Sequence, residues 1–272
     1  MTNKITVPVD WYRQSLRAIG PANVIARQLG VPLGLISIVP SEDLVSVREG
    51  DLRGVLYERG LEAELSILPD TSPGNRLVEY AGENPQELLC LSTHARGAIT
   101  EAVMGSIAFR VLRESGRPLL MVGPAVPEDW GGRLETVLIC LDGSAFAEGA
   151  IPPAAALAGG LGANLRLLQV FDPAVDAAPP GQDSGEWVYL RRTAGALERE
   201  HGVAVDWETL HGKDAGRALA DYADATPGAI LAMTSHGRTG AARAVMGGVA
   251  QSVCRHTRVP LLLQCPDLTK RY

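Results

Sequence analysis

The sequence predicts two tandem α/β domains, each a five-stranded parallel sheet with helices on both faces. Three observations support this fold class. Residues 93–122 and 235–264 align without a gap and are identical at 12 of 30 positions. Hydrophobic residues make up 46% of the chain and aromatic residues only 5%, which is typical of layered α/β interiors. Each half alternates apolar runs with helical stretches, an order that favours parallel strands joined by helices.

The first strand of each half is an apolar run that ends in an aspartate. KITVPVD closes at Asp10 and TVLICLD closes at Asp142. A helical stretch follows each of them, ending at Gly30 in the first half and in the glycine-rich residues 159–162 in the second. The next apolar runs, PLGLISIVP and NLRLLQVF, predict the second strands.

The remaining elements follow in the same order in both halves. Helices are expected over 44–59 and 186–201, and third strands at AELSILP and VDWETLH. Helices over 75–83 and 214–224 lead into PQELLCLSTH and PGAILAMTSH, whose almost continuous apolar character suits strands buried on both faces. One more helix and a last strand, PLLMV or PLLLQ, complete each half.

The segment between the halves, GPAVPEDWGGR, contains Pro, Gly and charge without an apolar period and predicts a linker. We expect a first domain over 1–124, a linker over 125–133 and a second domain over 134–272. The spacing of equivalent residues grows from 132 to 142, so the second half has ten extra residues. We assign them to a surface loop at 173–185, which either covers a ligand or is merely tolerated.

Net charge, the length of apolar runs and cysteine spacing limit the classes of function that the sequence supports. A net charge of −6 gives no general attraction for nucleic acid. The chain has no run of 18 apolar residues, and MTNKITVPVD lacks the apolar region of a signal peptide, so we expect a cytoplasmic protein without a membrane span. Cys90, Cys140, Cys254 and Cys265 show no CxxC spacing, which favours buried hydrophobic roles over disulfides or metal ligation.

A ligand site is expected where the winding direction of each sheet reverses, at the carboxyl ends of its first and fourth strands. Asp10 should therefore face the loop LSTHA, and Asp142 the loop AMTSHG. Each loop runs into a helix, opening at Gly105 or Gly247, whose free amides and partial positive charge favour an anion. Glycine there lets the backbone approach phosphate oxygens. The carboxylate suits the base or ribose of a nucleotide.

These residues resemble the universal stress protein family, and the chain looks like two copies of that family's domain joined end to end. The resemblance covers nearly the whole chain and implies a Rossmann-like, adenine-nucleotide α-hydrolase-like fold. It also implies that PLLMV and PLLLQ pair across a pseudo-twofold axis. The alternative is a sheet edge that is covered within each half. Family members that bind ATP resemble one another in the pattern G-x2-G-x9-G-[ST], together with an Asp that closes strand one.

The second half keeps two of the three glycines of this pattern over residues 234–248. Thr234 replaces the first glycine, and Gly248 replaces the hydroxyl residue. Residues 142–144 read Asp-Gly-Ser and match the family's strand-one ending in full. The resemblance implies these nucleotide contacts in the second half: Asp142, Gly143, Ser144, Val170, Met233, Thr234, His236, Gly237, Arg238, Gly247, Gly248 and Val249.

The first half keeps only the last glycine and the hydroxyl residue of the pattern. Ala95 replaces a glycine where phosphate would approach, and Trp11 and Tyr12 follow the aspartate in place of Gly-Ser. We therefore predict unequal sites, with the second half as the better one. The first-half candidates are Pro8, Asp10, Ser92, His94, Arg96, Gly105 and Ser106.

Several candidates also have a plainer explanation. The aspartates that close the first strands could end a strand and cap the next helix. His94 and His236 have no companion His or Cys at ligand spacing, which favours support of the loop over metal binding. Arg96 and Arg238 either reach phosphate or lie in solvent.

The resemblance implies a stress regulator that binds ATP or another adenine nucleotide, with or without Mg²⁺, and acts without catalysis or with very slow hydrolysis. Its protein partner is not predicted, and further dimerisation stays open. The motifs GxxxxGK[ST] and GxSxG are absent from the sequence. The main alternative is a nucleotide-free interaction scaffold with degenerate motifs. An ATP pyrophosphatase is disfavoured, because DWYRQS and DGSAFA follow the first strands in place of a Ser-Gly-Gly loop.

Overall fold

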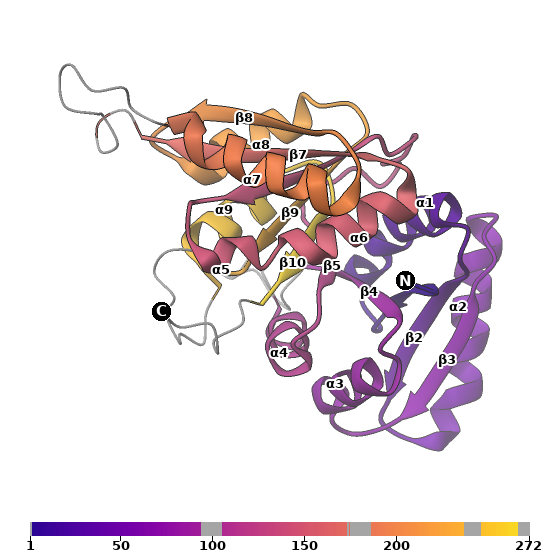
Figure 1. Ribbon diagram of the computed structural model, residues 1–272. Coiled ribbons are helices and arrows are strands. Elements are labelled where there is room, and N and C mark those ends of the chain that lie inside the picture. Colours follow the sequence, from indigo (N-terminus) through magenta and orange to yellow (C-terminus); the bar gives the residue numbers. More distant parts are fainter. Residues whose placement is uncertain (1, 94–104, 173, 175–185, 237–245, 266–272) are drawn as a thin grey trace, which may run out of the picture.

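The computed structural model describes residues 2–93, 105–172, 174, 186–236 and 246–265. Within these residues the strands form one continuous ten-stranded sheet in the order β3-β2-β1-β4-β5-β10-β9-β6-β7-β8 (Figure 1). The strands are β1 (Lys4–Pro8), β2 (Leu33–Val39), β3 (Glu64–Pro69), β4 (Glu87–Ser92), β5 (Leu119–Val122), β6 (Thr136–Leu141), β7 (Asn164–Phe171), β8 (Val205–His211), β9 (Ala229–Thr234) and β10 (Leu261–Gln264).

Helices connect the strands in the predicted alternation. They are α1 (Ile19–Leu29), α2 (Val45–Glu58), α3 (Pro73–Glu83), α4 (Ser106–Ser115), α5 (Ala145–Glu148), α6 (Ile151–Leu161), α7 (Glu186–His201), α8 (Ala215–Asp224) and α9 (Gly248–His256), with the 3₁₀ helices η1 (Arg13–Ala18) and η2 (Glu42–Leu44). The helices and strands predicted from the sequence are confirmed. In the described part of the chain, no helix is long and apolar enough to cross a bilayer.

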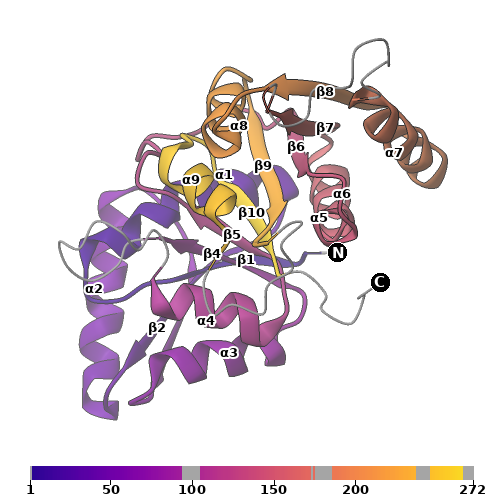
Figure 2. The same ribbon diagram turned by 90° about the vertical axis from the view of Figure 1, so that its left-hand side faces the viewer.

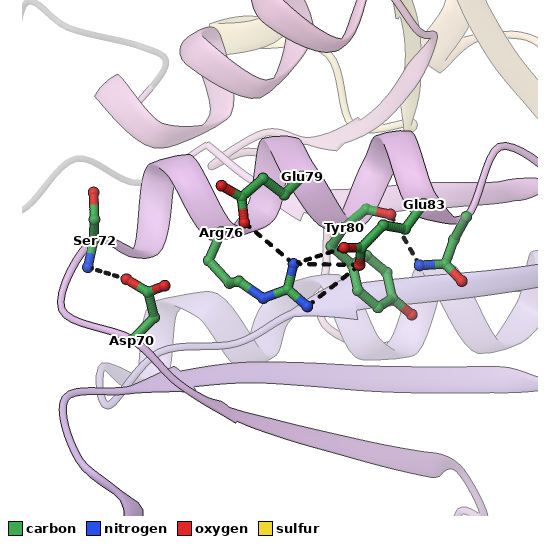
Figure 3. Close-up of polar contacts among 7 residues, drawn as sticks. Asp70, Ser72, Arg76, Glu79, Tyr80 and Glu83 are labelled. Atoms are coloured by element: carbon green, nitrogen blue, oxygen red, sulfur yellow. Dashed lines mark hydrogen bonds and ion pairs between the residues drawn. The ribbon is translucent and has the colours of Figure 1, made fainter.

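Local sequence signals explain where the helices begin and end. Helix α1 ends at Gly30 and α6 at the equivalent Gly162, with φ of 68° and 63°, a left-handed conformation that glycine adopts without strain. Helix α3 begins with Pro73, which suits the first helical position. Just before it, Asp70 Oδ1 accepts a hydrogen bond of 2.6 Å from the backbone N–H of Ser72 (Figure 3).

The two halves meet at the centre of the sheet. The strands within each half are parallel, whereas β5 and β10 pair antiparallel, with Leu120 opposite Leu262. This pairing confirms the arrangement that the family resemblance implies and rules out an edge covered within each half. All four residues of β5 are buried, so the pairing protects an apolar edge from water.

The buried core lies on the two faces of this sheet. One cluster packs α1, α2, α6 and α7 against one face, and the other packs α3, α4, α8 and α9 against the opposite face. In Figure 2, α8 and α9 lie on one side of β9, and α5 and α6 lie on the other side. Both clusters contain residues from both halves, so the two halves share their hydrophobic cores. The cores merge because the sheet continues through β5 and β10.

The segment between β5 and β6 is part of this packing. Val126 and Leu134 are buried in the core, and Arg17 donates hydrogen bonds to the carbonyls of Pro124 and Val126. The connection is therefore a packed element rather than a loose tether. The proposed boundaries at 1–124, 125–133 and 134–272 stay predictions.

The predicted hydrophobic role of the cysteines is confirmed for Cys90, Cys140 and Cys254, which are fully buried or nearly so. Burial raises the pKa of each of these thiols to about 12, so they remain protonated and unreactive at neutral pH. Cys265 is only partly buried, and burial raises its pKa as well.

Candidate functional site

The carboxyl ends of β6 and β9 form the edge at which the candidate site of the second half is built. These strands are neighbours, and the chain leaves β6 toward helix α6 on one face and β9 toward helix α9 on the other. Asp142, which follows β6, and Thr234, which ends β9, therefore flank one crevice. The predicted reversal point between the first and fourth strands of the half is confirmed.

Helix α9 supplies the hydrogen-bond donors of the crevice. Gly247 precedes it in an extended conformation, and no described side chain caps the helix. Gly248 and Val249, at the first two helical positions, are exposed, and Val249 has 43% of its surface accessible. The first amides of a helix lack partners within the helix, so this end can receive an anion.

Gly247 is required for the close approach of this helix to the strand. Its N–H donates to the carbonyl of Ser235 at 2.8 Å. A Cβ at Gly247 would lie 3.0 Å from that carbonyl oxygen and 3.6 Å from the Cα of His236. A larger residue here would push the helix away from the end of β9.

Side chains at the end of β9 brace the beginning of the loop. Thr234 Oγ1 donates to the carbonyl of His236 at 2.8 Å, and Ser235 Oγ lies 3.2 Å from Nδ1 of His236. Thr234 and Ser235 are buried. The contact between Ser235 and the His236 ring is consistent with the predicted role of this histidine in supporting the loop. A contact between His236 and a ligand stays a prediction.

Asp142 and Ser144 form the acceptor side of the crevice. Asp142 Oδ1 accepts the backbone N–H of Ser144 at 2.9 Å and its hydroxyl at 2.6 Å. Ser144 Oγ in turn accepts the N–H of Ala147 at 3.2 Å, which caps helix α5. Asp142 thus orients Ser144, the residue that caps helix α5. A contact between Asp142 and a ligand stays a prediction.

Two residues that the sequence analysis did not select lie beside Asp142. The hydroxyl of Tyr189, on α7, donates to Glu148 Oε1 at 3.0 Å, at the end of α5. Burial raises the pKa of Tyr189, and the negative charges of Glu148 and Asp142 raise it further. The phenol therefore stays protonated and acts as a donor, whereas the two carboxylates accept.

Gln169, on β7, was also missed. It is 5% exposed, and its Oε1 is buried without a hydrogen-bond partner among the described residues. Its Nε2 lies 3.8 Å from the position of a Cβ at Gly143, so the amide sits beside the turn that follows Asp142. Sheet register pairs Gln169 with Leu141, the last residue of β6.

The other predicted residues of the second half occupy different surroundings. Met233 is buried, and Val170 packs partly buried against the same core, on the face covered by α8 and α9. Gly143 has a φ of 82°, a left-handed conformation, at the turn after β6. Gly237 and Arg238 lie outside the described residues, as does nearly all of the predicted 173–185 loop.

The crevice of the first half is built differently. Asp10 Oδ1 accepts the backbone N–H of Tyr12 at 2.9 Å, and the chain then forms η1 in place of a capped α-helix. Ser92, at the end of β4, donates its hydroxyl to the carbonyl of Gln14 in η1 at 2.9 Å. The strand end and η1 are therefore tied together.

A buried cation lies beside Asp10. Arg48, on α2, is 5% exposed and donates to the backbone carbonyl of Asp10 and to Ser37 Oγ. Its guanidinium carbon lies 4.6 Å from the ring centroid of Trp11. Ser37 is the counterpart of Gln169, 132 residues earlier. The first half therefore has a guanidinium group beside Asp10, whereas the second half has hydrogen-bond acceptors beside Asp142.

The remaining first-half candidates are placed as follows. Pro8 ends β1, and Gly105 precedes α4 in an extended conformation, as Gly247 does before α9; no side chain in the described part of the chain caps either helix. Ser106 is exposed at the first position of α4. His94 and Arg96 lie outside the described residues. Among the described residues, no three His, Cys, Asp or Glu side chains are close enough to hold a metal ion.

A weak signal in the sequence marks one of the missed residues. Gln169 interrupts the apolar run NLRLLQVF on the same strand face as Leu165 and Leu167, which pack in the core. A polar residue at an inward position is unusual in a buried strand. Glu148, Tyr189 and Arg48 carry no comparable signal, because only the fold brings them to the strand ends.

Comparison with known proteins gives the same family for both halves. The model of the universal stress protein family matches residues 1–123 and again residues 133–263. A universal stress protein of Mycobacterium tuberculosis is 25% identical over 216 residues, which cover 75% of this chain and 70% of the relative. One from Methanocaldococcus jannaschii is 26% identical over 137 residues, covering 44% of this chain and 81% of the relative.

Solved structures share the fold over the whole chain. The crystal structure of a universal stress protein from Archaeoglobus fulgidus superposes with a TM-score of 0.68 at 18% identity, covering 97% of this chain and 98% of the other. A protein of unknown function from Pseudomonas aeruginosa superposes with a TM-score of 0.61, also at 18% identity, covering 98% and 93%. At this identity the likeness concerns the fold alone.

Proposed function

This chain belongs to the universal stress protein family, as a tandem member, and on that premise we propose that its second half binds an adenine nucleotide. The site is the crevice between the carboxyl ends of β6 and β9. The bound nucleotide is ATP or a related adenine nucleotide, with or without Mg²⁺. The protein acts as a regulator that responds to nucleotide and carries out no efficient chemistry itself.

The observation that carries this proposal is the open start of helix α9 across the crevice from Asp142. The exposed residues Gly248 and Val249 offer amides that no side chain among the described residues caps, and these suit phosphate oxygens. Gly247 keeps these amides close to the strand end. An acidic protein can hold phosphates this way, because the donors are backbone groups and need no basic surface.

The other end of the crevice suits the sugar and the base. Asp142 and Glu148 supply carboxylate acceptors, and Tyr189 supplies a hydroxyl. Ribose hydroxyls and the amino group of adenine are donors that such acceptors recognise. A ligand with an anionic end and a donor-rich end matches both sides at once, which supports a nucleotide over a free phosphate.

The first half is proposed to bind nucleotide more weakly or not at all. Arg48 and Trp11 fill the corner beside Asp10, and the guanidinium would face the donor groups of ribose or adenine. No side chain among the described residues caps the helix that starts after Gly105, so its first amides can still receive an anion. The first half thus keeps the phosphate side and has lost the acceptor side.

Native mass spectrometry of the full chain tests this proposal by counting nucleotides per molecule, in the wild type and in Gly247→Val and Gly105→Val. We expect one adenine nucleotide per wild-type chain, and an empty protein only for Gly247→Val, because its side chain would collide with the carbonyl of Ser235. Gly105→Val is the matched control in the other half. Unliganded melting temperatures check that both variants fold.

A second measurement separates this function from a nucleotide-free interaction scaffold. A ligand that binds only the folded state raises the melting temperature by mass action. Saturating ATP should raise the wild-type melting temperature by several degrees and leave that of Gly247→Val unchanged. Nucleotide-free protein without a thermal shift would contradict the proposal and favour the scaffold.

A further inference from the structure

Gln169 is the feature of the second half that the packing alone does not explain. The residue lies on the inward face of β7, among apolar neighbours, and is 5% exposed. Its Oε1 has no hydrogen-bond partner in the described residues. Buried polar atoms in native proteins nearly always have partners, so an orphaned carbonyl oxygen calls for a specific explanation.

The amide is aimed at the candidate site. Nε2 lies 3.8 Å from the position that a Cβ would take on Gly143, the residue after Asp142. Because Gly143 has no side chain, nothing from that residue stands between the amide and the turn. A rotation about the last side-chain torsion exchanges Oε1 and Nε2 at low cost, so the amide can present either atom there.

The first half shows what a purely structural residue looks like at this position. Its counterpart, Ser37, donates to the carbonyl of Val9 at 2.8 Å and accepts from Arg48 at 2.9 Å. The hydroxyl of Ser37 therefore has a partner both as a donor and as an acceptor. At this position, the unsatisfied atom occurs only in the half that we propose to bind nucleotide; the other such atom among the described residues, Arg17 Nε, lies elsewhere in the first half.

We propose that Gln169 reads the base of the bound nucleotide. Turned by a rotation about the last side-chain torsion, its Oε1 accepts a hydrogen bond from the 6-amino group of adenine, a group that glutamine side chains recognise. The inference rests on the nucleotide site proposed above. It adds a specificity-determining residue, supplied by a side chain, to a site otherwise assigned to backbone amides and carboxylates.

This assignment predicts which analogue the site rejects. Inosine triphosphate differs from ATP by a carbonyl in place of the 6-amino group, so an acceptor would face Oε1 and leave it unpaired. Sites built to hydrogen-bond a substrate group discriminate strongly against analogues that lack it. We expect the wild type to prefer ATP over inosine triphosphate by about 10-fold or more.

Calorimetric titration of the full chain with ATP and with inosine triphosphate tests the inference, using the wild type, Gln169→Leu and Ser37→Ala. Gln169→Leu should weaken ATP binding by about 10-fold and leave inosine triphosphate within about 3-fold, so the preference disappears. The same variant should melt at a higher temperature without ligand, because an orphaned polar atom is removed. Ser37→Ala should melt lower and keep the preference.

The outcomes are distinguishable. If the wild type binds neither nucleotide, the proposed function fails and the inference fails with it. If the wild type binds both nucleotides equally, or if Gln169→Leu leaves the preference intact, the nucleotide site stands and the role of Gln169 is overturned. Should Gln169→Leu not fold, Gln169→Met, whose flexible side chain fills the same space, replaces it under the same criteria.

Discussion

Glu87 shows at the residue scale how the chain accommodates a buried charge. Its side chain is 9% exposed, and Lys4 Nζ lies 2.6 Å from Oε1. Thr6 and Tyr80 donate their hydroxyls to Oε2 at 2.6 and 2.7 Å. Burial alone would raise the pKa of Glu87, but the hydrogen bonds from these three donors outweigh it and lower the pKa below its ordinary 4.5.

Glu87→Gln should therefore destabilise the protein in a pH-dependent way. Because the folded-state pKa lies below 4.5, the contribution of Glu87 is present above that pH and is lost as the pH falls through the folded-state value. We expect a loss of about 2 kcal/mol at pH 7, since Lys4 would keep only Glu64, an exposed carboxylate at 3.2 Å, as its ion-pair partner. Urea unfolding should show the gap between wild type and variant narrowing below pH 4.5.

Arg76→Ala is the control for this experiment, on the helix that carries Tyr80. Arg76 lies 3.4 Å from Glu79 and 3.2 Å from Glu83, and both glutamates are more than half exposed (Figure 3). Surface pairs of this kind contribute little, so the variant should change stability by about 0.5 kcal/mol or less. A gap between wild type and Glu87→Gln that stays constant with pH would contradict the assigned pKa.

At the element scale, the starts of α4 and α9 differ at their first helical residue. Ser106 opens α4 and Gly248 opens α9, and neither helix has a side-chain cap in the described residues. A Cβ on Gly248 would meet nothing within 4 Å, so the position tolerates a larger residue. No steric conflict therefore explains why α9 begins with a glycine where α4 begins with a serine.

Gly248→Ser should improve nucleotide binding by the proposed site. A hydroxyl at this position can donate to a phosphate oxygen beside the backbone amides, so we expect ATP to bind several-fold more tightly. Gly248→Ala is the matched control, since both substitutions remove a helical glycine and should raise stability by about 0.5 kcal/mol. Titration of both variants with ATP measures the difference; equal affinities would show that the hydroxyl reaches no phosphate.

The long elements were predictable because each carries an apolar period or run of sufficient length. The division of each stretch into η1 and α1, or into α5 and α6, was not predictable, because a helix of a few residues has no period to detect. The difference between η1 and α5 depends on two residues after each aspartate. Both aspartates accept the backbone N–H two residues on, but Ser144 caps α5 with its hydroxyl, whereas Tyr12 gives η1 no side-chain cap among the described residues.

At the scale of the whole molecule, Gln28 joins the two halves. Its Nε2 donates to the carbonyls of Leu134 and Leu161, and its Oε1 accepts the N–H of Leu134, each at 2.8 Å. The counterpart of Gln28 in the second half is Gly160, where an added Cβ would lie 2.8 Å from Leu29. Helices α1 and α6 therefore pack closely against each other (Figure 1), with a glutamine at this position in the first half and a glycine in the second.

Gln28→Ala should lower the free energy of unfolding of the whole chain, and both halves should still unfold together. Three hydrogen bonds are lost and the N–H of Leu134 loses its partner, so we expect destabilisation of about 1–3 kcal/mol. Unfolding followed by circular dichroism and by tryptophan fluorescence should remain one coincident transition, because the sheet and both cores run through the two halves. Two separate transitions would indicate that the halves are independent domains.

The site was predicted only in part. The repeated segment pointed to the crevice and to residues around Asp142 and Gly247, since these follow strands whose order the alternation of elements determines. Tyr189 and Arg48 could not be selected, because their distance to the crevice depends on how helices α7 and α2 pack across the strand ends. Local sequence carries no information about that packing. Gln169, on β7, was missed although it interrupts an apolar run.

The sequence by itself determined the duplication, the alternation of strands and helices, and the edge at which a ligand would bind, because these follow from repeats and from local hydrophobic patterns. Only the tertiary structure decided that the two halves share their cores, and that the corner beside the aspartate is rich in acceptors in one half and cationic in the other. Both depend on contacts between residues far apart in the chain, which local patterns do not encode.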